Sequence, residues 1–145
     1  MSQDPRDIKR QYWTCPRFAL ENGEVINDFC LAYIVHGTPL SDGSNIVLVT
    51  SSLAGDAHRL DFLIGDGLAL DPGRLCIVAV DAIGNGHTSS PSNSQKQRGL
   101  LFPQFSIRDM VESQYRLLSE VFAVESIFAV AGASMGGMQA LQWGV

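Results

Sequence analysis

Three short apolar runs, separated by longer and more polar segments, set the architecture that this sequence predicts. The runs cover Ile46–Thr50, residues 75–80 and residues 126–131, and each contains β-branched residues. A continuous apolar run of this length is typical of a strand that is buried on both faces. Because helix-length segments separate the runs, we predict parallel strands joined by crossovers in an α/β sheet.

An antiparallel hairpin is predicted ahead of these strands. Apolar runs at 17–20 and 28–35 flank the segment Glu21-Asn22-Gly23-Glu24. An Asn-Gly pair between two apolar runs is the strongest short-range hairpin signal. The sheet is therefore expected to begin with an antiparallel pair and to become mostly parallel afterwards.

The clearest helical pattern runs from Ile107 to about Phe122. Apolar residues recur there at steps of three and four, with charged residues on the opposite side. Ser106, followed three residues later by Asp109, predicts a capping box at the start of this helix.

Two other segments have weaker patterns. Residues 60–70 predict a short helix interrupted by Gly65 and Gly67, and residues 82–105 predict a long loop. A loop of that length inside a compact domain is more often functional than idle.

A glycine-flanked serine follows the last apolar run. The segment Gly132-Ala133-Ser134-Met135-Gly136 has the pattern G-x-S-x-G and precedes a second, shorter helical pattern. At a strand-to-helix turn this pattern is a nucleophile elbow, in which glycines leave room beside a strained serine backbone. Ser134 is the predicted nucleophile, which would form an acyl-serine. The structural elbow residues are Gly132, Gly136 and Gly137, and the alternative is a tight turn with an idle serine.

The order of the elements is that of an α/β-hydrolase fold up to its nucleophile elbow. We expect residues 1–145 to form a single partial domain, the N-terminal half of this fold, from which the C-terminal strands and the lid are absent. In such folds the oxyanion of the intermediate is bound by two backbone N–H groups, one from the residue after the nucleophile and one from the loop after the third strand. These donors are predicted to be Met135 and Leu53, although Leu53 could equally be a packed loop residue.

The histidines do not complete a catalytic triad in this prediction. The acid and the histidine follow the nucleophile in this fold, so we expect the triad Asp and His not to be present in this chain. His58, which lies two residues after Asp56, is disfavoured as the base for that reason. His36 and His87 are expected to make local backbone hydrogen bonds or to face solvent.

Composition narrows the class of partner. The chain of 145 residues has a net charge of −5 and a pI near 5.0, which argues against nucleic acid and anionic membranes as ligands. No apolar run approaches the length of a membrane span, and no leader segment is recognisable. Small-molecule ligands and a cytoplasmic location are therefore expected.

The cysteines and histidines give no sign of a metal site. Cys15, Cys30 and Cys76 are an odd, widely spaced set without a C-x-x-C pair, so we expect reduced thiols in or near the core. The three histidines are more than 20 residues apart, which excludes the spacing of a structural zinc site.

Several of these segments resemble the homoserine O-acetyltransferase family of α/β-hydrolase-fold acyltransferases. The resemblance runs from about residue 28 to the end and is most specific in the S-M-G-G-M-Q-A stretch from Ser134. It is carried by residues 53–58, 106–111 and 132–141. It implies a ping-pong reaction in which acetyl-CoA acylates Ser134 and a substrate hydroxyl then takes the acyl group. It also implies oxyanion roles for Leu53 and Met135.

Three hypotheses are kept for the function of this chain. The first is an acyltransferase that moves an acetyl or other acyl group from acyl-CoA to a small hydroxyl acceptor, with no tightly bound cofactor. The second is a serine ester hydrolase, since water can resolve the same acyl-enzyme. The third is a truncated fragment without independent activity, whose unpaired strand edge would favour pairing with another chain, so a homo-oligomer stays open. Departures from the family pattern at Ser51-Ser52 and in the loop 84–93 leave the acceptor open.

Overall fold

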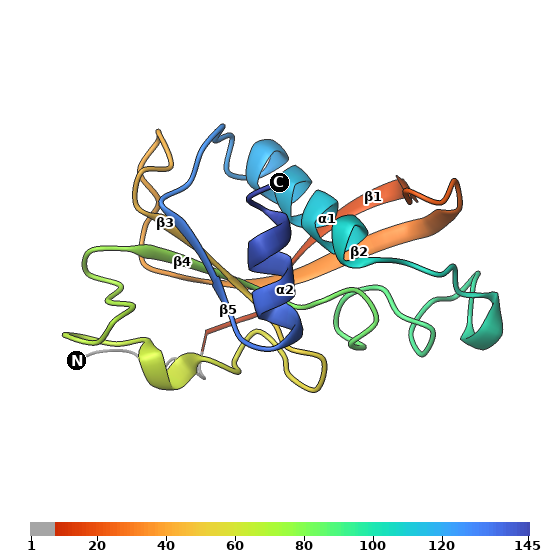
Figure 1. The fold of residues 1–145 in the computed structure, drawn as a ribbon, viewed down its shortest axis with the longest axis horizontal. Helices are drawn as coiled ribbons and strands as arrows, with labels where there is room; N and C mark the ends of the chain where they lie inside the picture. Colours follow the sequence, from red (N-terminus) through yellow and green to blue (C-terminus); the bar gives the residue numbers. More distant parts are fainter. Residues whose placement is uncertain (1–7) are drawn as a thin grey trace.

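The computed structural model describes residues 8–145, which form one five-stranded mixed sheet with two α-helices (Figure 1). The strand order is β1-β2-β4-β3-β5. The strands are β1 (Gln11–Ala19), β2 (Val25–His36), β3 (Ile46–Thr50), β4 (Cys76–Val80) and β5 (Ala129–Gly132), and the helices are α1 (Ile107–Glu120) and α2 (Met135–Gln142).

The strand directions confirm the predicted change from antiparallel to parallel. β1 pairs with β2 and β2 with β4 in antiparallel fashion, whereas β3 is parallel to both β4 and β5. β3 and β4 are fully buried along their length. Their continuous apolar sequences follow from this position, because both faces of the central strands are covered.

The first strand is longer than the sequence pattern predicts. The hairpin turn lies at Asn22-Gly23 as expected, but β1 extends back to Gln11, beyond the predicted start at residue 17. The buried side chains of β1 are Trp13 and Cys15 before Pro16 but Phe18 after it, so the alternation changes phase at the proline. Pro16 lies opposite Asp28 of β2, which has a φ of 51°. Proline is tolerated here because β1 is an edge strand. The break in alternation hid the first half of the strand.

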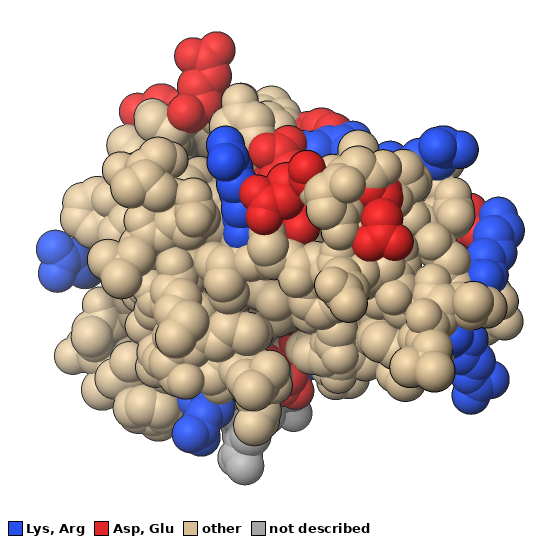
Figure 2. All heavy atoms as spheres, turned by 45° about the vertical axis from the view of Figure 1, so that its right-hand side comes forward, with Lys and Arg blue, Asp and Glu red and all other residues tan. Residues whose placement is uncertain are grey.

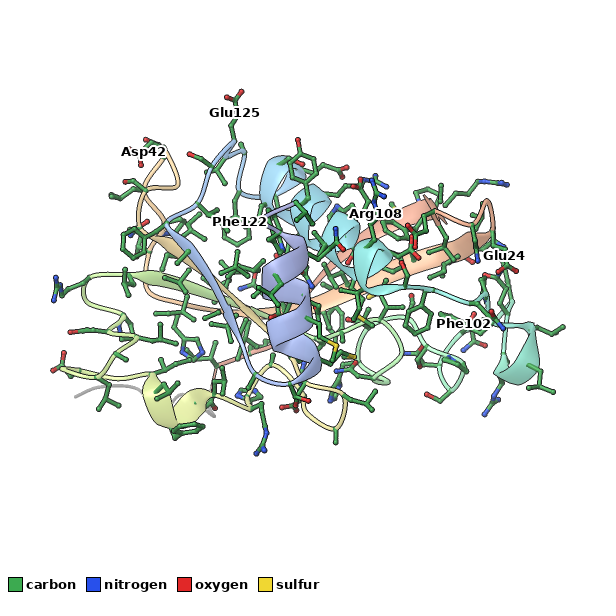
Figure 3. The ribbon with its side chains drawn as sticks, viewed as in Figure 1. Glu24, Asp42, Phe102, Arg108, Phe122 and Glu125 are labelled. Atoms are coloured by element: carbon green, nitrogen blue, oxygen red, sulfur yellow. The ribbon has the colours of Figure 1, made fainter. Side chains whose placement is uncertain are left out.

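Both helices pack on the same face of the sheet. Met110, Leu117 and Leu118 of α1, with Met135 and Trp143 around α2, contact one core that includes side chains from β1 to β4. Tyr33 of β2 packs edge-to-face against Phe122, which Figure 3 shows just beyond the end of α1. This core holds the two helices against the strands that carry the elbow.

An irregular segment covers the opposite face. Ala57 and Ile64 pack there against side chains of β2, β3 and β4. The helix predicted at 60–70 is wrong, because only Asp61–Leu63 forms a turn of 3-10 helix. Gly65 and Gly67 have φ values of 159° and 71°, and the chain folds back so that Ile64 bridges Leu70. Glycines in these conformations end a helix.

The predicted loop at 82–105 is confirmed, with one turn of 3-10 helix at Gly99–Leu101. Side chains of this loop bond the edge of β2 that β4 leaves free. Thr88 Oγ1 accepts from the N–H of Ala32 and Ser89 Oγ from that of Cys30. The amide side chain of Gln97 bonds both Asn27 N–H and Val25 C=O. The loop is therefore fixed along the sheet.

Helix α1 begins with the capping box that the sequence predicts. Ser106 Oγ accepts from the N–H of Asp109, and the Asp109 carboxylate accepts from the N–H of Ser106. Asp109 also accepts from the N–H of Glu21 in the hairpin turn, 2.8 Å away. Figure 3 shows Glu24 of this turn and Arg108 of the first helical turn at the same end of the molecule.

Charged side chains of both signs are interspersed on the surface. On the face in Figure 2, acidic groups gather in the upper part, basic groups lie mostly near the edges, and a wide area below is uncharged. Within residues 8–145, no helix has the length and apolarity required to cross a membrane.

Removing the Ser106 cap of α1 tests how much this cap contributes to the free energy of unfolding. Ser106→Ala should lower the free energy of unfolding by about 1 kcal/mol, because the N–H of Asp109 loses its acceptor. Ser119→Ala, at an exposed serine of the same helix, should change it by less than about 0.5 kcal/mol. Urea unfolding followed by circular dichroism measures both, and equal losses would contradict the role of the cap.

Candidate functional site

Ser134 stands at the turn between β5 and α2 with an unusual backbone. Its φ is 57° and its ψ is −124°, a conformation that L-residues rarely adopt. The residue is exposed and occupies the N-cap of α2, yet its side chain makes no capping hydrogen bond. The hydroxyl of Ser134 is thus presented to solvent instead of being used to stabilise the helix.

Two glycines allow this turn to lie against β3. A Cβ on Gly132 would lie 2.3 Å from Thr50 Oγ1 and 2.5 Å from the carbonyl of Gly136. A Cβ on Gly136 would lie 2.4 Å from the carbonyl oxygen of Thr50. Gly137 differs, because a Cβ there would meet only Gly132 O at 3.4 Å, an ordinary contact. The steric demand for glycine is therefore at 132 and 136.

Thr50, which the sequence reasoning missed, fastens the elbow to the sheet. Its hydroxyl donates to Gly136 O at 2.8 Å and lies 3.3 Å from Ala131 O. Thr50 is the last residue of β3 and pairs with Gly132 of β5. The β3–β5 register thus places this hydroxyl beneath the turn that carries Ser134.

The structure brings Leu53 and Met135 together. Both line one cavity of about 390 Å³, with Ile83, Phe105 and Met110 among its other walls. Leu53 is 78% exposed, and Met135 is the first residue of α2, where an N–H has no acceptor within its own helix. Neither backbone N–H donates to any residue between 8 and 145. Leu53 and Met135, each with a backbone N–H that has no acceptor among residues 8–145, therefore line one cavity, and Ser134 directly precedes Met135 in the chain.

Buried polar side chains hold the loop that carries Leu53. Ser51 Oγ accepts from the N–H of Ala82, and Asp81 Oδ1 accepts from that of Ala57. Asp81 is fully buried and also binds Arg10, with its Oδ2 2.7 Å from Arg10 Nε. The sequence reasoning missed Asp81, although its position directly after an apolar strand could have indicated a role at this sheet edge.

The second missed group is a chain of amides under the elbow. Gln139 and Gln114 are almost completely buried and hydrogen-bonded to each other, and Gln139 also bonds the carbonyl of Ser51. Gln139 lies four residues after Met135, so helical periodicity places it on the same buried side. This spacing could have indicated from the sequence that the side chain of Gln139 is buried.

None of the three histidines hydrogen-bonds Ser134. His58 pairs through Nδ1 with Asp61 Oδ2 at 2.8 Å, and His87 is exposed, as expected, with Nε2 3.9 Å from Asp56. The expectation for His36 is wrong. It is buried, its Nε2 has no partner among the described residues, and burial lowers its pKa.

The thiols are free, and two of the three are buried. Cys15 and Cys76 lie in the core and Cys30 is half-buried. Burial raises the pKa of all three, that of Cys76 to about 11. Among residues 8–145, no cluster of three histidine, cysteine or acidic side chains is arranged to hold a metal ion. The three thiols are therefore poorer candidates for a nucleophile than the exposed hydroxyl of Ser134.

Alanine at the two helix glycines should separate their roles. Gly136→Ala should lower the free energy of unfolding by about 1–3 kcal/mol, because its Cβ would press on the carbonyl of Thr50. Gly137→Ala, the matched control, should be neutral or stabilising by up to about 1 kcal/mol, since alanine favours helix. Thermal or urea unfolding measures both, and tolerance of Gly136→Ala would contradict the close approach.

The raised pKa of Cys76 makes its reactivity predictable. At pH 8 only a small fraction is thiolate, so iodoacetamide should modify Cys76 in the folded protein about 100-fold more slowly than in the denatured protein. Because the folded-state pKa is raised, the rate should increase as the pH rises towards that value. Mass spectrometry of timed samples measures it. Equal rates in folded and denatured protein would contradict the burial.

Comparison with known proteins gives two kinds of relative, although no family model matches the chain. The homoserine O-acetyltransferase of Methanosalsum zhilinae is 40% identical over 143 residues, which cover 87% of this chain and 29% of that protein. The ethyl acetate hydrolase of Pseudomonas veronii is 41% identical over 128 residues, covering 87% and 37%. The solved structure of the acetyl esterase MekB matches with a TM-score of 0.88 and 37% identity, covering 93% and 40%.

The chain thus spans between 29% and 40% of the length of these relatives. Its hairpin, mixed sheet and two helices match part of α/β-hydrolase structures, which confirms the predicted fold class. The relatives are acyltransferases and esterases, so the family is enzymatic. By sequence and by fold, this chain belongs to the homoserine O-acetyltransferase and acetyl esterase family of α/β-hydrolases.

Proposed function

We propose that this chain carries the nucleophile and the oxyanion hole of an enzyme that transfers an acetyl group through an acyl-serine at Ser134. The observation that carries the proposal is the exposed, uncapped Ser134 directly before Met135, which lines one cavity with Leu53, while neither of these two residues has an acceptor for its backbone N–H among residues 8–145. An activated nucleophile and preorganised donors for the developing oxyanion are what acyl transfer requires.

The reaction proceeds in two halves. Ser134 Oγ attacks the acetyl carbonyl and gives its proton to a base, and the N–H groups of Leu53 and Met135 stabilise the oxyanion. The intermediate collapses, the bond to the leaving group breaks, and the protonated alcohol or thiol departs. A hydroxyl acceptor then attacks the acyl-serine, and Ser134 regains its proton.

The base in this proposal comes from another part of the full-length enzyme. His36, His58 and His87 are the three histidines of the chain, and none of them bonds Ser134. The N-terminus of α2 supports the same chemistry, since the positive end of the helix dipole lies next to the developing oxyanion.

The proposed reaction is the family's acyl transfer, with acetyl-CoA as the co-substrate and a small hydroxyl compound as the acceptor. Its support is the sequence identity to homoserine O-acetyltransferases, such as the 40% shared with that of Methanosalsum zhilinae.

A second candidate is hydrolysis of small acetyl esters, with water as the acceptor. The support from the cavity is that none of the described residues in its walls has a charged side chain; Asp56 and Arg59 line only the adjoining hollow, which shares Leu53, Gly84 and Asn85. The ethyl acetate hydrolase of Pseudomonas veronii, at 41% identity, is consistent with this alternative.

The proposal predicts that the full-length enzyme acquires one acetyl group on Ser134. Rapid mixing with acetyl-CoA or p-nitrophenyl acetate, followed by acid quench and peptide mass spectrometry, should find the adduct on this residue. Ser134→Ala should remove it and lower kcat by at least about 10³-fold. Ser126→Ala, at another exposed serine, should leave both unchanged. Full activity of Ser134→Ala would overturn the proposal.

Competition between acceptors distinguishes the two candidates. With acetyl-CoA as donor, the acyltransferase should form O-acetylhomoserine in preference to acetate when homoserine is added, whereas the hydrolase should release acetate at a rate that homoserine does not change. Chromatographic quantification of both products measures this partition.

A further inference from the structure

We propose that Gln139 is a positioning residue that fixes the distance between the two backbone N–H groups of the oxyanion hole. The inference rests on the proposed function, because it assigns Leu53 and Met135 as donors. Gln139 touches neither substrate nor the reacting atoms. It acts through the chain segments that carry the donors.

Gln139 contacts both of those segments at once. Its Nε2 lies 3.0 Å from the carbonyl oxygen of Ser51, two residues before Leu53. The same nitrogen lies 3.4 Å from the carbonyl oxygen of Met135. Since Gln139 is fully buried, its amide has no water as an alternative partner. One side chain thus bridges the loop of the first donor and the helix turn of the second.

The orientation of this amide is set by a chain of partners. The indole N–H of Trp143 can only donate, and it donates to Gln114 Oε1 at 2.9 Å. Gln114 Nε2 must therefore point the other way, and it donates to Gln139 Oε1 at 2.6 Å. This leaves Gln139 Nε2 directed at Ser51. The relay gives Gln139 one hydrogen-bonding orientation.

Other contacts of the loop do not reach α2. The Ser51 hydroxyl bonds the N–H of Ala82, and Ala57 at the far end of the loop is held by Asp81. Both anchors fix the loop to the end of β4. Thr50 fastens the elbow to β3 but precedes the loop. Among these contacts, the Gln139 amide alone connects the Leu53 loop to α2.

A role limited to core packing would not require this chemistry. Burying a primary amide is costly unless its groups are paired, and an apolar side chain of similar volume would fill the same space. Here two amides are buried in succession, and the relay ends on the backbone two residues before a free N–H donor. Only the φ and ψ rotations of Ser52 separate the peptide plane of the Ser51 carbonyl from that of the Leu53 N–H.

The test uses two near-isosteric substitutions in the full-length enzyme. Gln139→Met keeps the volume and removes the hydrogen bonds, and Gln139→Glu replaces the donor by an acceptor facing the Ser51 carbonyl. Gln142→Met, on a half-buried residue of the same helix, is the matched control. Thermal unfolding and gel filtration identify variants that remain folded.

For folded variants we expect kcat for p-nitrophenyl acetate to fall about 10- to 100-fold, with KM changed by less than about 3-fold. The affinity for a trifluoromethyl ketone, whose adduct places an oxyanion in the hole, should fall in parallel with kcat. The control should keep both values. A folded Gln139→Met enzyme with unchanged kcat, or a lower kcat with unchanged affinity for the ketone, would overturn the inference.

Amide hydrogen exchange provides a readout that does not depend on activity. In Gln139→Met, and in Gln139→Glu if the methionine variant does not fold, the peptide spanning 51–57 should exchange faster than in the wild type, while the β1–β2 hairpin should not change. Unchanged exchange at 51–57 would overturn the inference even if the wild type proved inactive. If the wild type is inactive but the variant exchanges faster, the proposed function is rejected, whereas the role of Gln139 in holding the Leu53 loop to α2 is supported.

Discussion

The close approach of the elbow to the end of β3 is the constraint on which the site depends. The backbone of Gly136 passes so near the carbonyl of Thr50 that no Cβ fits between them, and Gly132 is confined by the same threonine. This contact forces the chain to turn within two residues and leaves Ser134 with a positive φ. The strain is maintained because parallel pairing of β3 with β5 and the packing of α2 over-determine the turn.

Around the elbow, apolar contacts and hydrogen bonds have different roles. Apolar side chains of α1 and the sheet hold the helices in place without defining orientation at the level of single atoms. Directional bonds appear where backbone groups must be placed, at Thr50 and along the relay from Trp143 to Ser51. Buried polar groups are costly unless they are satisfied, and those of Gln114 and Gln139 are hydrogen-bonded in the structure.

Much of the fold could be predicted from periodicity. The central strands could be predicted because continuous apolar runs fit strands that are buried on both faces of an α/β sheet. Helix α1 could be predicted because its capping box and its apolar periodicity indicate the same helix. The first half of β1 was hidden by Pro16, and residues 60–70 gave a helical pattern that Gly65 and Gly67 do not permit. One proline in the first place and two glycines in the second set the backbone conformation while changing the hydrophobic pattern little. The elbow was predictable because its glycines are a local steric necessity, whereas Asp81 and Gln114 act through partners distant in sequence.

The loop 82–105 lies beside β2 where a neighbouring strand would lie, and it bonds that strand mostly through side chains, with one backbone bond from the N–H of Ser89 to the carbonyl of Cys30. Thr88, Ser89 and Gln97 provide the hydrogen bonds that a neighbouring strand would provide through its backbone. A true strand needs a continuous run of extended backbone, but this arrangement needs only a few fixed points. Between those points the loop is held by its own contacts at the wall of the cavity, where Gly84 has a φ of 93° with no room for a Cβ beside Phe105, and the side chain of Asn85 donates to Asp81. One segment thus does two things: it satisfies the free edge of β2 and it forms a wall of the cavity with Ile83, Gly84 and Phe105.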